Sequence, residues 1–384
     1  FIGTLGVAGT ATSVAGIPFY TADNSIYTHD VSGTDDTASS NAAYGIEALD
    51  AITTGDENVA IGRKALTDLN TGEGNVAVGM EAGEDNTTGS QNVAVGKQAG
   101  TKTSANSVAV GYQALRLNTG TANIAIGKET AKSNTSGTRI IAIGAEAYDA
   151  ADTENDNLAI GEGALGGSVA GGEYNVAVGN YTLDALTSGD YNTTMGYGAG
   201  SALTTGDRNV IIGSQAGDAI QSASSSVIIG DEAVGGGVMT ADQNVVIGRN
   251  AGHDLTSGDN NVLLGFESGS NQTTASANTF LGWKAGGLGI VTGGTNVGIG
   301  PQALLDLTSG ANNISMGYRS AYELTTGARN TSIGVFALKN PDTENDNLAL
   351  GYQALGDGAI AGGEYNVALG NYTLDALTSG DGNT

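Results

Sequence analysis

Two acidic segments are the strongest candidates for a chemical role in this chain of 384 residues. Residues 152–156 read Asp-Thr-Glu-Asn-Asp, and the same five residue types recur at 342–346. Closely spaced carboxylates and amides offer oxygen ligands, which a hard cation such as calcium prefers. The spacing matches neither the EF-hand loop nor the nonapeptide calcium repeat, so an acidic surface turn is the alternative. The metal hypothesis names six ligands: Asp152, Glu154, Asp156, Asp342, Glu344 and Asp346.

Residues for catalysis are scarce. The only histidines are His29 and His253, which lie in dissimilar contexts, and the chain has no cysteine. A Ser-His-Asp triad therefore lacks a suitable base, and thiolate or disulfide chemistry is excluded. Paired carboxylates suit glycoside cleavage, but the acids here lie in repeated loops, which is typical of a solvated edge. We expect no enzymatic activity and no cofactor other than the hypothetical calcium.

Tyrosines next to acids or amides are candidates for contact with a glycan receptor. Three of them cluster in the sequence, two more repeat part of the cluster, and the chain has a single Trp. The alternative is that these rings cover the edges of the fold, and no glycan-binding residue is assigned. The residues are Tyr174, Tyr181, Tyr191, Tyr365, Tyr372 and Trp283.

The charge of the chain excludes some partners. Asp and Glu number 40 against 14 Lys and Arg, which gives a net charge of −26 without any basic cluster. Nucleic acid and anionic membranes are therefore not expected as partners. The longest apolar runs are about five residues, so we expect no insertion into a membrane.

A repeat of about 17 residues must position all of these side chains. Each unit reads approximately Asn-Val-Ala-Ile-Gly, and the Gly that closes it, here called the marker Gly, occurs 20 times from Gly45 to Gly370. The third residue after each marker is always Ala, Ser or Thr, and Thr/Ser-Gly turns follow. Such a unit has no room for a helix and cannot bury its own apolar face, whereas stacked units can. We predict an all-β solenoid of about 20 coils, each with two short strands and two turns.

The faces of the predicted strand have different compositions. The residues that flank its centre, such as Val59 and Ile61, share one face and are aliphatic in nearly every unit. We expect this face to form the core of the coil and the middle residue, such as Ala60, to point outward. In five successive units the middle residue is large and apolar, which predicts an exposed stripe that a symmetric oligomer would bury. The predicted interface residues are Ile211, Ile228, Val246, Leu263 and Phe280.

An Asn opens most of the repeats, for example Asn58, Asn75 and Asn92. Equivalent side chains in stacked coils would form an amide ladder that satisfies loop backbone groups. The alternative is a local Asx turn in each coil.

The repeat resembles known fibrous proteins over roughly residues 20–384. Units such as Asn-Val-Ala-Val-Gly at 175–179, alternating with Thr-Thr-Gly loops, are similar to repeats of bacteriophage tail fibres and to head repeats of trimeric autotransporter adhesins. The resemblance implies a left-handed parallel β-roll, three identical chains around a common axis, and a spacer or adhesive role.

The chain divides into residues 1–40, expected to be an N-terminal cap or connector with a degenerate first repeat, and the repeat array 41–384, which ends in mid-repeat. We expect a structural fibre protein: a rigid trimeric shaft or head segment of a phage or injection-machine tail fibre. The alternatives are a bacterial surface adhesin or extracellular filament subunit, and a polysaccharide-active enzyme. The expected partners are two further copies, other segments of the same fibre, and a cell-surface glycan or protein receptor. The expected location is the virion or the cell surface.

Overall fold

The computed structural model describes residues 12–14, 17–22, 25–27, 37–357 and 362–384. The chain forms two compact units, Phe1–Ser188 and Gly189–Thr384, called the first and the second unit below. Each unit is a parallel β-solenoid, and together they have about 19 turns with a spacing near 17 residues. The described residues contain strands and turns but no helix, and so none that could cross a membrane.

The first unit begins with two antiparallel pairs, β1 (Thr12–Val14) with β2 (Ile17–Ala22) and β2 with β3 (Ser25–Tyr27). From β3 onward the pairing is parallel, and Ile26 of β3 lies opposite Ala42. The degenerate repeat that we predicted before the first marker Gly therefore includes β3, a strand that stacks on the array. Asn24 and Thr28, which flank β3, and His29 lie outside the described residues.

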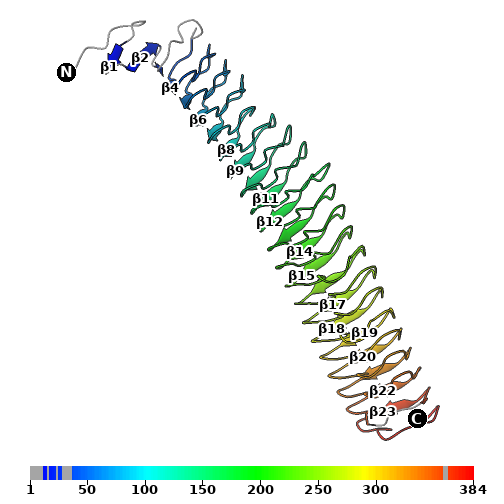
Figure 1. Cartoon of the computed structure of the whole chain (residues 1–384). Coiled ribbons are helices and arrows are strands. Elements are labelled where there is room, and N and C mark those ends of the chain that lie inside the picture. Colours follow the sequence, from blue (N-terminus) through cyan, green and yellow to red (C-terminus); the bar gives the residue numbers. More distant parts are fainter. Residues whose placement is uncertain (1–11, 15–16, 23–24, 28–36, 358–361) are drawn as a thin grey trace. The chain divides into compact units, whose positions relative to one another are not determined.

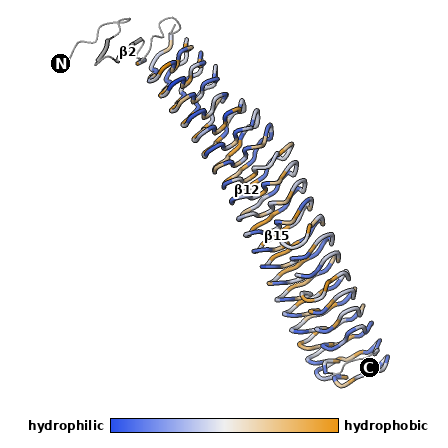
Figure 2. The backbone as a smooth tube through the Cα atoms, viewed as in Figure 1, coloured by the Kyte–Doolittle hydropathy of each residue, from blue (hydrophilic) through white to orange (hydrophobic). Residues whose placement is uncertain are grey.

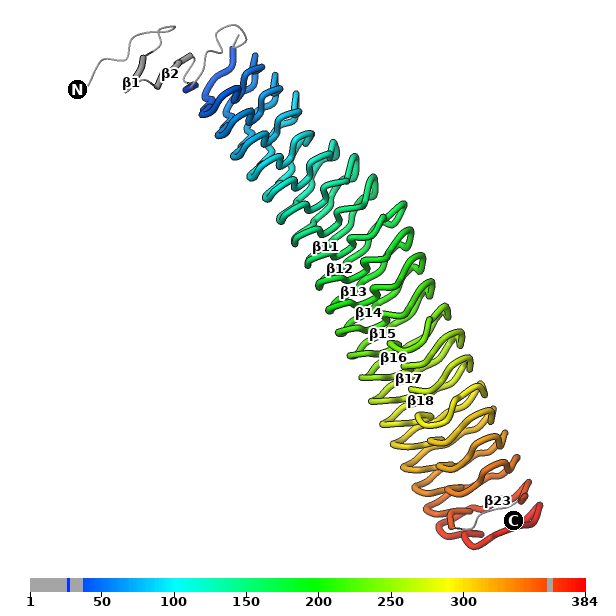
Figure 3. The backbone as a smooth tube through the Cα atoms, in the orientation of Figure 1, coloured from blue at the N-terminus to red at the C-terminus, as the bar shows by residue number. Residues whose placement is uncertain are grey.

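Each coil of the first unit contributes one strand of three residues, and consecutive strands pair in register. Figures 1 and 3 show the successive coils stacked on one another. The strands are β4 (Ala42–Tyr44), β5 (Val59–Ile61), β6 (Val76–Val78), β7 (Val93–Val95), β8 (Val108–Val110), β9 (Ile124–Ile126), β10 (Ile141–Ile143), β11 (Leu158–Ile160) and β12 (Val176–Val178).

The second unit repeats this arrangement, again with one strand per coil and parallel, in-register pairing. Its strands are β13 (Thr193–Met195), β14 (Val210–Ile212), β15 (Val227–Ile229), β16 (Val245–Ile247), β17 (Val262–Leu264), β18 (Thr279–Leu281), β19 (Val297–Ile299), β20 (Ile314–Met316), β21 (Thr331–Ile333), β22 (Leu348–Leu350) and β23 (Val367–Leu369).

The prediction of two strands per coil is wrong. The segment opposite each named strand is built of turns, and only isolated bridges occur there, such as Ile220 with Met239. The turns need left-handed backbone at residues that are not Gly: in one coil, Lys64 has φ 61° and Leu66 has φ 51°. Such conformations cost about 1 kcal/mol each. Hydrogen bonds between coils offset this cost, since the N–H of Leu66 donates to the carbonyl of Ala82 at 2.9 Å.

The marker Gly is required for two reasons. Gly213 has φ +139°, and a Cβ on it would lie 2.5 Å from the carbonyl oxygen of Gly230 in the next coil. The same clash with the following marker recurs along both units. A side chain therefore does not fit at this bend.

The assignment of the strand faces is wrong. The middle residue of each strand points into the coil, where Ala60, Ile211 and Phe280 are fully buried, while the flanking residues are half-buried or exposed. The five predicted interface residues Ile211, Ile228, Val246, Leu263 and Phe280 are therefore core residues of the single chain. The physical reason is the narrow interior: it is also filled by the small third residue and the fourth residue after each marker, such as Ala65 and Leu66.

In several coils a large residue on one side of this interior faces a small residue on the other. Where the middle residue is Ala60, the fourth residue after the marker is Leu66, and both are buried. Where the middle residue is Phe280, that fourth residue is Gly286, and a Cβ there would lie 2.5 Å from Cδ2 of the ring. Likewise, a Cβ on Gly269 would lie 2.8 Å from Cδ2 of Leu263. In these coils the core keeps its volume, and what differs is which of the two positions carries the large side chain.

Candidate functional sites

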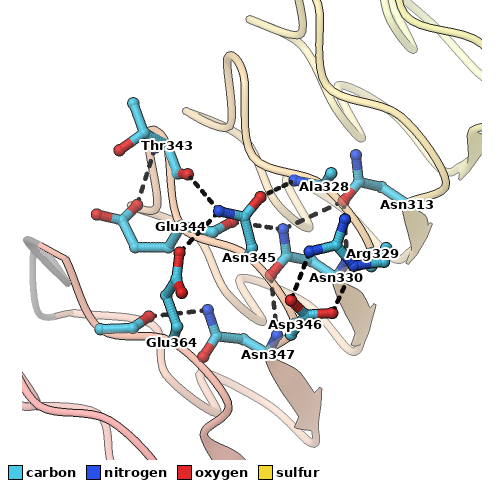
Figure 4. Close-up of polar contacts among 11 residues, drawn as sticks. Asn313, Ala328, Arg329, Asn330, Thr343, Glu344, Asn345, Asp346, Asn347 and Glu364 are labelled. Carbon is cyan, nitrogen blue, oxygen red and sulfur yellow. Dashed lines mark hydrogen bonds and ion pairs between the residues drawn. The ribbon is translucent and has the colours of Figure 1, made fainter.

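The first candidate site, the pair of acidic segments, lies in turns that precede β11 and β22. In the second segment, Nε and Nη2 of Arg329 donate to the two carboxylate oxygens of Asp346 at 2.7 and 2.6 Å (Figure 4). This charged hydrogen bond holds the pKa of Asp346 below its usual value. Arg139 and Asp156 repeat the arrangement in the first segment, at 2.6 and 2.7 Å. Both carboxylates are thus engaged by a cation of the chain itself.

Glu344, at the centre of the second segment, is only 5% exposed and accepts hydrogen bonds from the backbone. Its Oε2 accepts from the N–H groups of Asp342 and Thr343 at 2.7 and 2.9 Å, and its Oε1 accepts from the N–H of Gly362 at 2.9 Å. Glu154 makes the equivalent bonds in the first segment. These glutamates close the turn and join it to the next coil.

The asparagine of each segment also joins neighbouring coils. Oδ1 of Asn345 accepts from the N–H of Ala328 at 2.8 Å, and its Nδ2 donates to Oε1 of Glu364 at 2.8 Å (Figure 4). Asp342 accepts a hydrogen bond from the hydroxyl of Thr325.

The prediction of calcium ligands is therefore corrected. The carboxylates of Asp342, Glu344 and Asp346 each have a different partner within the protein, and the same holds for Asp152, Glu154 and Asp156. No cluster of three or more metal-binding side chains occurs in the part of the chain that the structure describes. The alternative, an acidic turn, describes these segments.

The asparagines that open the repeats form the predicted ladder. Oδ1 of Asn58 accepts from the backbone N–H of Asn75 at 2.9 Å, and its Nδ2 donates to the carbonyl of Gly72 at 2.9 Å. In two coils a serine replaces the asparagine: the hydroxyl oxygens of Ser107 and Ser226 accept from the backbone N–H of the Asn in the next coil. Ile140 occupies the position in another coil, where its N–H still bonds Asn123. The ladder thus satisfies buried backbone groups of neighbouring coils, which the local Asx turn would not do.

The outer face of the sheet carries the first and third strand residues, which we had predicted to form the core. In each unit the first and third strand residues point away from the coil and form two largely apolar columns. Figure 2 shows that hydrophobic residues recur from coil to coil. Several remain well exposed, such as Ile61 at 44% and Leu350 at 44%. The exposed members with large side chains are Tyr44, Ile61, Ile126 and Ile141 in the first unit, and Met195, Val262, Leu264, Leu281, Ile314, Ile333, Leu350 and Leu369 in the second.

The tyrosines named from the sequence are exposed, but they do not form one group. Tyr181 donates to Oε1 of Glu162 at 3.1 Å, and Tyr191 lies under the guanidinium of Arg208. Tyr174, Tyr365 and Trp283 are also exposed, and Trp283 lies beside Lys284.

A second aromatic group, of which only Tyr372 was named from the sequence, lies in the second unit. Tyr318, Phe336, Tyr352 and Tyr372 come from four consecutive coils of the second unit, and each ring touches the next edge to face. The signal for it was present, since each residue is the first or second after a marker Gly.

His253 is half-exposed, and its Nδ1 lies 2.7 Å from Oδ1 of Asp254. This contact joins sequence neighbours on a turn. It brings together a base and an acid, and it adds no nucleophile.

Comparison with known proteins adds no relative: no family model and no curated protein matches this sequence.

Proposed function

We propose that this chain is a segment of a homotrimeric fibre, in which the outer faces of three parallel sheets meet around a common axis. The observation that carries the proposal is the pair of apolar columns on those faces. A soluble protein rarely leaves so long an apolar surface in water, because burying it is favourable. Closure around a symmetry axis would cover the columns of every copy at once.

The size of the surface supports such an assembly. Coils stacked at about 4.8 Å give the second unit a face about 50 Å long and about 10 Å wide, which is about 500 Å² per chain. The first unit adds a similar area. Stable interfaces bury about 800 Å² on each partner, so the two columns are of the right order.

The number of three chains, the left-handed roll and the fibre role come from the resemblance to tail-fibre repeats and adhesin heads. In this proposal the chain acts without catalysis, as a spacer in a tail fibre of a virion or injection machine. A bacterial surface adhesin is the alternative, and the segments that flank the array would distinguish the two.

The charge is compatible with this role. A net charge of −26 keeps long particles apart in solution, while the columns themselves consist of uncharged side chains. Association through the columns is then favoured over side-by-side contact of the acidic edges.

The test is the mass of the chain in solution, measured by native mass spectrometry or light scattering. We expect a trimer, and a double variant Val262→Asp with Leu264→Asp should convert it to a folded monomer, because both side chains point outward from β17. Thr274→Asp, on an exposed turn, is the matched control and should remain trimeric. A monomeric or dimeric parent chain, or an unchanged mass of the double variant, would contradict the proposal.

A further inference from the structure

Four aromatic rings form a continuous strip across the coils of β20 to β23, at the orange-to-red end of Figure 1. The ring centroids of Tyr318 and Phe336 are 5.4 Å apart, those of Phe336 and Tyr352 are 6.4 Å apart, and those of Tyr352 and Tyr372 are 5.2 Å apart. We call Tyr318, Phe336, Tyr352 and Tyr372 the aromatic strip. Neighbouring rings meet edge to face, so the strip is one ordered surface.

The strip is not needed to fill the coil. In the coils of β21 to β23 the buried core cluster consists of Ala337, Leu338, Ala349, Ala354, Leu355 and Ala368, and the hydrophobic residues packed against it are Leu374 and Leu377. Tyr318, Tyr352 and Tyr372 remain 37%, 39% and 56% exposed. Rings that are exposed and add nothing to the core indicate a surface for a partner.

The same positions carry polar residues elsewhere. The first and second residues after the marker are Arg63 and Lys64 in one coil of the first unit, and Lys128 and Glu129 in another. The repeat therefore does not require an aromatic residue at this corner. Aromatic residues occur there in other coils too, such as Tyr112 and Phe266, but in the coils of β20 to β23 four consecutive coils carry one.

Polar groups accompany the rings. The guanidinium of Arg319 lies 5.2 Å from the ring of Tyr318 and 4.9 Å from that of Tyr322, and its Nε donates to Oε1 of Gln302. Lys339 lies over Phe336. Next to Tyr352, Nε2 of Gln353 donates to Oδ1 of Asp357 at 2.9 Å. Hydrogen-bond donors and acceptors thus flank an apolar surface.

From this combination we propose that the aromatic strip binds a neutral carbohydrate chain. The C–H faces of a sugar ring are weakly positive and pack on the negative face of an aromatic ring. Sugar hydroxyls can bond to the adjacent amides, carboxylates and guanidinium. The coil spacing of about 4.8 Å is close to the advance of one sugar residue along an extended chain, so groups on successive coils lie about one sugar apart.

The charge selects the class of carbohydrate. Although two cations, Arg319 and Lys339, lie at the strip, the net charge of −26 makes the chain as a whole repel polyanions such as sulfated or phosphorylated glycans. The strip also lies past the marker Gly, on residues other than the two columns of the sheet face. The inference therefore does not depend on the trimer, and a monomeric chain would retain the strip.

The experiment is affinity electrophoresis of the full chain in gels that contain dextran, mannan, galactomannan or xyloglucan, with heparin as the anionic probe. We expect retardation by at least one neutral polysaccharide and none by heparin. Tyr318→Ala and Tyr352→Ala should each weaken that binding at least tenfold. Tyr112→Ala is the matched control, because Tyr112 is a 40% exposed tyrosine of the first unit with Lys97 beside its ring; it should bind as the parent chain does.

Circular dichroism and the mass of each variant complete the design. Parent-like spectra and masses with lost binding support the proposal. No retardation by any neutral polysaccharide, preference for heparin, or equal binding by Tyr352→Ala overturns it. A changed oligomeric mass of Tyr352→Ala also overturns it, since the strip would then be a contact between copies of the chain.

Discussion

The backbone N–H of Asn330 donates a 2.9 Å hydrogen bond to Oδ1 of Asn313, its equivalent one coil earlier (Figure 4). Nδ2 of Asn313 donates in turn to the carbonyl of Gly327 at 2.9 Å. One side chain thus satisfies two buried backbone groups that belong to the next coil. This relationship joins neighbouring coils in addition to their apolar core.

Removing the Asn313 side chain should lower the stability of the second unit. Asn313→Ala leaves the N–H of Asn330 and the carbonyl of Gly327 without these partners, and each unsatisfied buried group costs about 1–3 kcal/mol. We expect a loss of about 2–5 kcal/mol in the free energy of unfolding of the second unit, measured by denaturant titration.

Asn313→Ser is the matched variant for this prediction, because Ser226 occupies the equivalent position naturally and accepts from the N–H of Asn244 at 3.2 Å. It should lose less than the Ala variant. Equal losses in both variants would show that the acceptor for the next coil is not what the position supplies.

Phe280 and Gly286 share one space in the core, so a larger residue at one position should compensate for a smaller residue at the other. Gly286→Leu should destabilise the second unit by at least about 1–3 kcal/mol, because its Cβ alone would already meet the ring of Phe280. Phe280→Ala alone should cost about 3–5 kcal/mol through the cavity that it leaves. The double variant Phe280→Ala with Gly286→Leu recreates the pairing of Ala60 with Leu66 and should be more stable than the sum of the single effects predicts.

A double-mutant cycle on thermal or chemical unfolding measures this coupling. Additive effects would mean that the two positions do not share one space. The left-handed backbone at Gly286 is no obstacle, since Leu66 adopts φ 51° at the equivalent position.

A buried tyrosine should make the first unit sensitive to alkali. Tyr148 is fully buried, its hydroxyl accepts from Nδ2 of Asn157 at 3.0 Å, and burial raises its pKa far above the ordinary value of 10.0. Above about pH 10 the unfolded chain loses this proton while the folded chain keeps it, so stability falls as the pH rises.

Tyr148→Phe should cost about 1 kcal/mol at neutral pH through the lost hydrogen bonds, but it should remove this part of the decline above pH 10. Tyr112→Phe, at an exposed ring, is the control and should keep the parent's alkaline unfolding curve. An identical pH dependence of the parent and Tyr148→Phe would contradict the assignment.

The acidic turns should be stabilised by the protein and not by a metal. Glu344→Gln places an amide NH₂ opposite a backbone N–H, because both carboxylate oxygens of Glu344 accept from N–H groups. We expect a loss of about 1–3 kcal/mol in the free energy of unfolding.

Glu364→Gln is the comparison, since Oε1 of Glu364 accepts one side-chain bond from Asn345 in a part-buried position, and it should lose less. Addition of EDTA or calcium should leave the unfolding temperature of the parent chain unchanged. A rise of several degrees with calcium would restore the metal hypothesis.

Much of the fold could be predicted from local chemistry. The marker glycines and the alternation around Ala60 locate a strand in every repeat, and the recurrent Asn places the ladder. The second strand could not be predicted, because residues such as Lys64 and Leu66 take left-handed conformations that their types do not favour. Hydrogen bonds to neighbouring coils, which no single repeat contains, stabilise those conformations.

The candidate sites depended still more on the tertiary structure. The composition of residues 342–346 suggested a metal site, but stacking places Arg329 against Asp346 and the N–H of Gly362 against Glu344. These partners lie 17 and 18 residues away, in adjacent coils. The aromatic strip likewise becomes a surface only when four coils are stacked.

By itself, the sequence determined the period, the parallel stacking of an all-β chain and the need for Gly at the bend, because each follows from a repeated local pattern. Only the tertiary structure decided which face of the strand is inside. Alternation shows that Val59 and Ile61 share a face and that Ala60 lies on the other, but either face could be the core. The width of the coil settles the choice, since its interior holds the middle residues together with the side chains that follow each marker. The more hydrophobic face is therefore left outside, where another chain can cover it.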